Sequence, residues 1–98
     1  QKIIMEIKEL LNTARQIWGD EKLPLARIIV CMGKVFGDIC RWERNDAKDK
    51  NCHNPEELKK EMGNIIFSTI RWCDDLGYDP EECVALAIAC QKDFVKGL

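Results

Sequence analysis

The chain has 98 residues, of which 46% are hydrophobic and 33% are charged, and its formal net charge is −2. This composition excludes a disordered tail and a membrane span, and the interspersed charges leave no basic surface for nucleic acid. We therefore expect one soluble domain over residues 1–98, small enough to need either a dense core or a partner subunit.

The first two predicted helices cover residues 1–18 and 24–44. In the first, apolar residues recur at spacings of three and four along one face: Ile3, Ile7, Leu10, Leu11, Ala14 and Trp18. A polar break and Pro24 separate it from the second helix. The residues that we expect the second helix to bury are Ile28, Met32, Val35, Ile39 and Trp42.

Two proline-containing signals mark the third and fourth predicted helices, at residues 55–76 and 80–95. Asn54 and Asp79 each precede a proline, and each is followed three residues later by a glutamate, which is typical of a capped helix start. Gly77 is expected to end the third helix in the left-handed conformation. The polar stretch 45–53 is predicted to be a loop.

The third helix has the broadest apolar stripe in the chain. Its members are Leu58, Met62, Ile65, Ile66, Thr69, Ile70, Cys73 and Leu76. Phe67 and Trp72 widen this stripe beyond what one neighbouring helix would cover, which predicts contact with a second subunit. The fold class is therefore all-α, a four-helix bundle completed by dimerisation.

The six cysteines follow no disulfide framework. No Cys-x-x-Cys pair occurs, and five of the six fall within helical patterns. We expect reduced, mostly buried thiols in a cytoplasmic protein, and the charged N-terminal residues predict no secretory signal. Cys52 and His53 could begin a zinc site, but no second ligand pair stands at a suitable spacing.

Two polar stripes carry the candidate site. At 100° per residue, one side of the second helix presents Arg27, Lys34, Asp38 and Arg41, and one flank of the third presents Glu61, Asn64, Ser68 and Arg71. These stripes are either solvated faces or the two walls of a cleft. Gly37 and Gly63 favour the cleft, since a missing side chain would let the opposing helix approach.

Three segments carry a family resemblance: Phe36-Gly37-Asp38-Ile39, the run KEMGNI at 60–65, and the run WCDDLGYDPEE at 72–82. The first two are similar to the acidic signatures Glu-Glu-x-x-Glu and Glu-x-Gly-Asp-Val of the MazG-like, all-α nucleotide pyrophosphohydrolases. The third is similar to the continuation of the second signature. The resemblance covers roughly residues 15 to 95.

The resemblance implies hydrolysis of a nucleoside triphosphate to a monophosphate and pyrophosphate, with Mg²⁺ held by carboxylates of both helices. It assigns Asp38 and Glu61 as catalytic and metal-binding residues, with Asn64 as a further metal ligand. Lys34, Val35 and Lys60 stand at positions that are acidic in the family. Only two anionic positions of the signatures therefore remain, which is a weak basis for holding Mg²⁺.

Three functions remain open. The chain is a divergent pyrophosphohydrolase with a single Mg²⁺, a silent relative that binds a nucleotide or another anion, or a helical protein-interaction module. In the second reading, Lys34, Arg27 and Arg41 would supply the positive charge. The family also implies a homo-oligomer, either a dimer or a tetramer.

Overall fold

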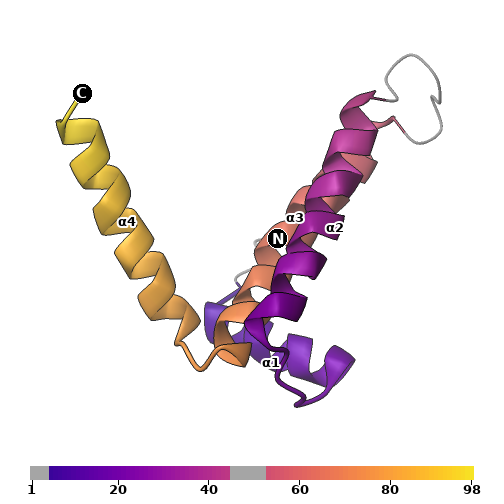
Figure 1. Cartoon of the computed structure of the whole chain (residues 1–98), viewed down its shortest axis with the longest axis horizontal. Coiled ribbons are helices and arrows are strands. Elements are labelled where there is room, and N and C mark those ends of the chain that lie inside the picture. Colours follow the sequence, from indigo (N-terminus) through magenta and orange to yellow (C-terminus); the bar gives the residue numbers. More distant parts are fainter. Residues whose placement is uncertain (1–4, 45–52) are drawn as a thin grey trace.

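The computed structural model describes residues 5–44 and 53–98. Within these ranges the chain forms four helices and no strand: α1 (Ile7–Trp18), α2 (Leu25–Arg44), α3 (Pro55–Asp75) and α4 (Pro80–Lys96) (Figure 1). The all-α prediction is confirmed. No helix in this part of the chain combines the length and apolarity that a membrane span requires.

The boundaries of α2, α3 and α4 lie within one residue of the predicted ones. The start of α1 was predicted wrongly, because the backbone of Glu6 is extended (φ −86°, ψ 151°) and the helix begins at Ile7. Residues 1–4, with the predicted apolar position Ile3, lie outside the described residues, as do residues 45–52 of the predicted loop with Cys52.

Side-chain caps begin α3 and α4 as predicted. The side chain of Asn54 accepts a hydrogen bond from the backbone N–H of Glu57 at 3.0 Å. That of Asp79 accepts one from the backbone N–H of Glu81, also at 3.0 Å. A proline follows each cap and supplies a φ angle already suited to a helix.

A left-handed glycine ends α3. Gly77 has φ 82°, which only glycine adopts without strain. The Tyr78 N–H donates to the Cys73 carbonyl at 3.0 Å, and the Gly77 N–H donates to the Asp74 carbonyl at 2.9 Å. These two bonds form a Schellman motif, and the predicted stop at Gly77 is confirmed.

The packed part of the molecule consists of α1, α2 and α3, with α3 in the centre. Its buried apolar residues are Ala14, Ile28, Ile70 and Trp72. Trp72 therefore belongs to the core of the single chain, and the prediction that it widens an exposed stripe was wrong. Met32 and Trp18 were expected in buried faces, but 42% and 64% of their surfaces are exposed.

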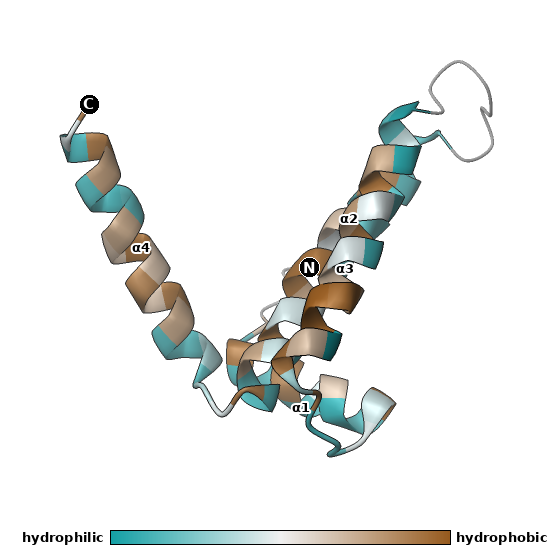
Figure 2. Ribbon diagram, in the orientation of Figure 1, coloured by the Kyte–Doolittle hydropathy of each residue, from teal (hydrophilic) through white to brown (hydrophobic). Residues whose placement is uncertain are grey.

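Helix α4 leaves this packed part after its first turn. Pro80 is buried and Cys83 is half-buried, whereas every residue from Val84 to Leu98 is exposed. Figure 1 shows α4 diverging from the α2–α3 pair to form a V. Figure 2 shows hydrophobic residues along α4 and on α2 and α3, so α4 carries apolar surface that the single chain does not cover.

Candidate functional site

The predicted site lies on the α2–α3 pair. Glu61 of α3 is buried, with 9% of its surface exposed, and its Oε1 accepts a hydrogen bond from Asn64 Nδ2 at 3.0 Å. Asp38 of α2 is half-buried and accepts a weaker bond from Arg41 at 3.3 Å. The two carboxylates thus have different partners, one neutral and one cationic.

Lys60 of α3 interacts electrostatically with three carboxylates, those of Glu57, Glu61 and Asp38. Its Nζ donates to Glu57 Oε2 at 2.7 Å. This hydrogen bond and the charge of Glu57 raise the pKa of Lys60, and the charges of Glu61 and Asp38 raise it further. Asp38 from α2 and Glu61 from α3 are therefore both within electrostatic range of the same ammonium group.

This donor set is a poor match to Mg²⁺. The ion requires near-octahedral oxygen ligands and is usually held by carboxylates together with substrate phosphates. Here Asp38 is engaged by Arg41, and the ammonium group of Lys60 stands near both carboxylates. In residues 5–44 and 53–98, no three His, Cys, Asp or Glu side chains lie close enough to form a metal-binding group.

The three cations predicted to hold an anion lie exposed on α2. Arg27 and Lys34 are exposed and form no ion pair with the residues that the structure describes, while Arg41 is bound to Asp38. Arg71, on the same stripe as Glu61, turns to α1, where its guanidinium carbon lies 4.6 Å from the centre of the Trp18 ring. This cation–π contact joins α1 to α3.

Gly37 and Gly63 do not mark a close approach of helices. A Cβ atom built on either residue would meet no atom within 4 Å. The expectation that they allow tight packing across a cleft was wrong for the single chain, and both glycines border open space instead.

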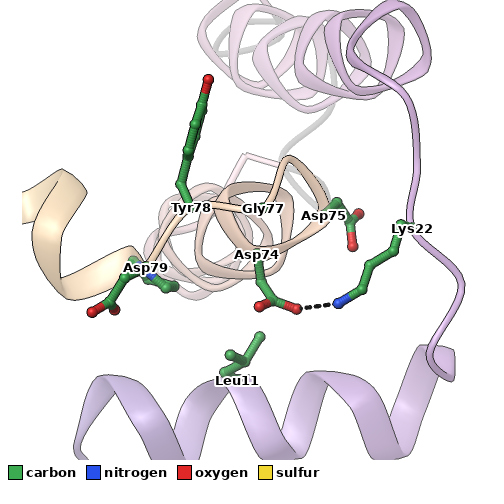
Figure 3. Close-up of a pocket in the computed structure, with 8 residues that line it drawn as sticks. Leu11, Lys22, Asp74, Asp75, Gly77, Tyr78 and Asp79 are labelled. Atoms are coloured by element: carbon green, nitrogen blue, oxygen red, sulfur yellow. Dashed lines mark hydrogen bonds and ion pairs between the residues drawn. The ribbon is translucent and has the colours of Figure 1, made fainter.

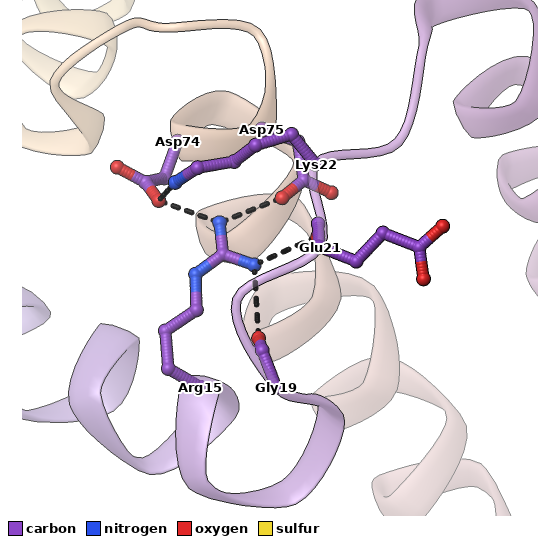
Figure 4. Close-up of polar contacts among 6 residues, drawn as sticks. All are labelled: Arg15, Gly19, Glu21, Lys22, Asp74 and Asp75. Atoms are coloured by element: carbon purple, nitrogen blue, oxygen red, sulfur yellow. Dashed lines mark hydrogen bonds and ion pairs between the residues drawn. The ribbon is translucent and has the colours of Figure 1, made fainter.

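A second polar cluster, which the sequence did not reveal, joins α1, the α1–α2 linker and the end of α3 (Figure 4). Arg15 Nη2 donates to Asp74 Oδ2 at 2.5 Å and to Asp75 Oδ1 at 2.6 Å. Lys22 Nζ donates to the same Asp74 oxygen at 2.6 Å. The aspartates were part of a quoted motif, but no local pattern identifies partners 52 to 60 residues away.

The pKa values of this cluster follow from its contacts. Burial alone would lower the pKa of Arg15, but the hydrogen bonds to Asp74 and Asp75 outweigh it and raise the pKa. The hydrogen bonds from Lys22 and then Arg15 lower the pKa of Asp74. Both shifts favour the charged forms, so the cluster is an ion-pair network at neutral pH.

An open pocket of about 490 Å³ lies beside this network (Figure 3). Lys22, Asp74, Asp75, Tyr78 and Asp79 contribute to its lining. Most of these charges already have a structural task, because Lys22 binds Asp74, Arg15 binds Asp74 and Asp75, and Asp79 caps α4. The cluster therefore connects α1, the α1–α2 linker and the end of α3.

The thiols differ in part from the expectation. Cys31, Cys40, Cys73, Cys83 and Cys90 are all unpaired. None of these five is fully buried, since three are half-buried and two are exposed, so the prediction of mostly buried thiols was wrong for them.

The chain was compared with family models, curated proteins and solved structures. No match was found in any of the three comparisons. The resemblance to the MazG-like family consequently rests on residues 36–39, 60–65 and 72–82 and stays a prediction.

Proposed function

We propose that the protein is a catalytically silent relative of the MazG-like pyrophosphohydrolases and acts as a helical protein-interaction module. The observation that carries this proposal is helix α4, in which every residue from Val84 onward is exposed. Residues 84–90, VALAIAC, are seven apolar residues in succession, so no side of this segment is polar. A helical segment that is apolar all round is normally buried, so residues 84–90 of α4 form a segment that calls for a partner.

The charges around the α2–α3 site support catalytic silence. Cleavage between the α and β phosphorus atoms needs positive charge at the leaving oxygens, which the metal supplies in this class of enzyme. Lys34, Val35 and Asn64 stand at family positions that would otherwise add metal-binding carboxylates. Lys60 and Arg41 further weaken the attraction of Asp38 and Glu61 for a cation.

One observation favours a second candidate, a divergent pyrophosphohydrolase using Asp38, Glu61 and Asn64. Among the residues that the structure describes, no cation lies within 4 Å of the Glu61 carboxylate, although this side chain is buried. A buried carboxylate without a close counter-ion is destabilised, and a bound cation would relieve this. The candidate keeps nucleoside triphosphates as the substrate class.

An assay of pyrophosphate release separates the two candidates. We expect wild type with Mg²⁺ and each common nucleoside triphosphate to release pyrophosphate no faster than Glu61→Gln, which preserves shape and removes the charge. If wild type shows magnesium-dependent turnover and Glu61→Gln abolishes it, the proposed lack of catalytic activity is refuted and the divergent enzyme is established.

A restored variant tests whether the two helices have been aligned correctly with the family. Lys34→Glu, Val35→Glu and Asn64→Asp together return three carboxylates to α2 and α3. We expect this variant to bind Mg²⁺ more tightly than wild type in a calorimetric titration. A folded triple variant that binds no more Mg²⁺ than wild type would show that the assignment of the site is wrong.

A further inference from the structure

We propose that Cys73 and Cys83 are a redox-active thiol pair, which a small-molecule disulfide converts to an intrachain disulfide that joins the end of α3 to the first turn of α4. The turn between the two helices holds these thiols together at the point where α4 leaves the packed part of the molecule. This activity is additional to the proposed function and does not depend on it.

Both cysteines take part in the backbone hydrogen bonds of the turn. The carbonyl of Cys73 accepts from the N–H of Tyr78 at 3.0 Å, within the Schellman motif that ends α3. The N–H of Cys83 donates to the carbonyl of Asp79 at 3.0 Å, in the first turn of α4. The left-handed Gly77 and the Asp79 cap fix the backbone between them. The same hydrogen-bonded turn therefore sets the positions of both thiols.

The two thiols meet across this turn. They share a hydrogen bond, and both cysteines are half-buried, whereas every residue of α4 after Cys83 is exposed. A disulfide requires the two sulfur atoms to lie about 2 Å apart. Thiols that already share a hydrogen bond need only a small further approach, so the disulfide can form without a large movement of either helix.

The next thiol along α4 is too far away to compete. Cys90 follows Cys83 by seven residues, which corresponds to about 10.5 Å along a helix that rises 1.5 Å per residue. The Cα atoms of a disulfide lie within about 7 Å of each other. Cys83 therefore cannot pair with Cys90 while α4 is helical, and Cys73 is the partner that the fold supplies.

Oxidation proceeds by two exchange steps, in which the small disulfide RSSR accepts two electrons. The Cys83 thiol loses its proton and attacks one sulfur atom of RSSR, so a mixed disulfide forms at Cys83 and the first RS⁻ leaves and takes up a proton. The Cys73 thiol then loses its proton and attacks the sulfur atom of Cys83, and the second RS⁻ leaves and is protonated in turn. Two cysteine thiols and one RSSR thus become one intrachain disulfide and two RSH.

Cys83 is the thiol that attacks first. Burial, and then the contact with Cys83, raises the pKa of Cys73 to about 11, so only about one Cys73 in a thousand is a thiolate at pH 8. Attack by Cys73 on an external disulfide is slow for this reason. Its attack on the mixed disulfide is intramolecular, and the high effective concentration of a neighbouring group compensates for the small thiolate fraction.

Acidic residues beside the pair determine the kind of disulfide that it accepts. Glu81 and Glu82 immediately precede Cys83, and both are exposed. Their negative charges repel an anionic disulfide. We therefore expect a small uncharged disulfide to react more readily than an anionic one.

Peptide mapping of the full chain tests the pair. The reduced protein is treated at pH 8 with 2-hydroxyethyl disulfide, which is small and uncharged, and the remaining thiols are blocked with iodoacetamide. Without reduction, trypsin and a glutamate-specific protease then separate Cys73 from Cys83 by cleavage after Glu82. We expect peptide 72–82 to be joined to peptide 83–92 by a disulfide, in protein that keeps the single-chain mass of 11.3 kDa on a non-reducing gel. Absence of this link, or a link found only in covalent dimers, would overturn the proposal and leave the proposed function untouched.

Three substitutions locate the bond. Cys73→Ser and Cys83→Ser should each abolish the linked peptides, and Cys73→Ser should accumulate the mixed disulfide at Cys83, the attacking thiol. The matched control is Cys90→Ser, which removes an exposed thiol from the same helix and from the same peptide 83–92. The control should form the link as wild type does. Loss of the link in Cys90→Ser would place the bond at Cys90 and overturn the pairing.

A redox titration of wild type keeps the test valid if a variant fails to fold. The linked fraction is measured at equilibrium in mixtures of 2-mercaptoethanol and its disulfide, with the protein either folded or unfolded in urea. Because a disulfide that fits the fold is favoured by folding, we expect its equilibrium constant to be at least about tenfold larger in the folded protein. An equal or smaller constant in the folded protein would show that the turn does not hold the two thiols together, and would overturn the proposal.

Discussion

The ion-pair network at the end of α3 offers the sharpest test of the packed part of the molecule. Arg15 lies on α1 and Asp75 at the end of α3, and the exposed fractions of their side chains are 13% and 1%. The structure provides no second cation for Asp75 among the described residues, and Asp75 Oδ2 is already buried without a hydrogen-bond partner. Arg15→Ala would therefore leave a buried carboxylate without its counter-ion.

The expected loss is about 3 kcal/mol in the free energy of unfolding. Removing one partner of a buried ion pair typically costs about 3 to 5 kcal/mol. The lower end applies here, because Asp74 is 28% exposed and keeps its bond to Lys22. For a domain of this size, such a loss lowers the melting temperature by about 12 to 24 °C.

Urea unfolding, followed by far-UV circular dichroism at one fixed protein concentration, measures this loss. The matched control is Lys22→Ala, which removes a cation that is 54% exposed and should cost less than about 1 kcal/mol. Adding Asp75→Asn to Arg15→Ala should recover part of the stability, since the unpaired charge disappears. If Arg15→Ala costs no more than Lys22→Ala, the network does not hold α1 on α3 and the reasoning fails.

Three further predictions concern single groups. The hydrogen bonds from Lys22 and Arg15 lower the pKa of Asp74, so the contribution of Asp74 to the free energy of unfolding is complete above the ordinary aspartate pKa of about 3.9 and is lost as the pH falls through the lowered value. In Asp74→Asn, the urea midpoint should therefore fall less steeply with decreasing pH than in wild type. An equally steep fall in the variant would contradict this. Burial, and then the contact with Cys83, raises the pKa of the Cys73 thiol to about 11, so at pH 8 iodoacetamide should label exposed Cys40 well before Cys73. Mass spectrometry showing the reverse order would be inconsistent with the packing of α4 on α3. Asn54→Ala removes the α3 cap and should cost about 1 kcal/mol in urea unfolding, whereas Asn54→Asp should cost little, and equal losses would argue against the cap.

The helices could be predicted because their signals are local. A cap, a proline and a left-handed glycine act within a few residues, which is why the start of α3 and its end near Gly77 agree with the sequence. The start of α1 has no side-chain cap, and its position was missed. Local signals thus determined the accuracy of each boundary.

Which side of a helix is covered could not be predicted in the same way. Apolar periodicity identifies a side that avoids water but not the chain that covers it. Met32 has the spacing of a core residue and is exposed, whereas Trp72 was assigned to an interface and is buried. The cluster of Arg15 with Asp74 and Asp75 depends on the long-range packing of α1 on α3, for which one sequence carries no periodic signal.

The two opposite sides of α2 give this sequence an unusual evolutionary freedom. At 100° per residue, the stripe with Lys34 and Asp38 lies across the helix from the exposed apolar residues Ile29 and Phe36. Substitutions at separated positions with no shared partners act additively, so drift on one side places little constraint on the other. Point mutations could therefore change the charges on the polar side of α2 while the apolar side stayed as it is.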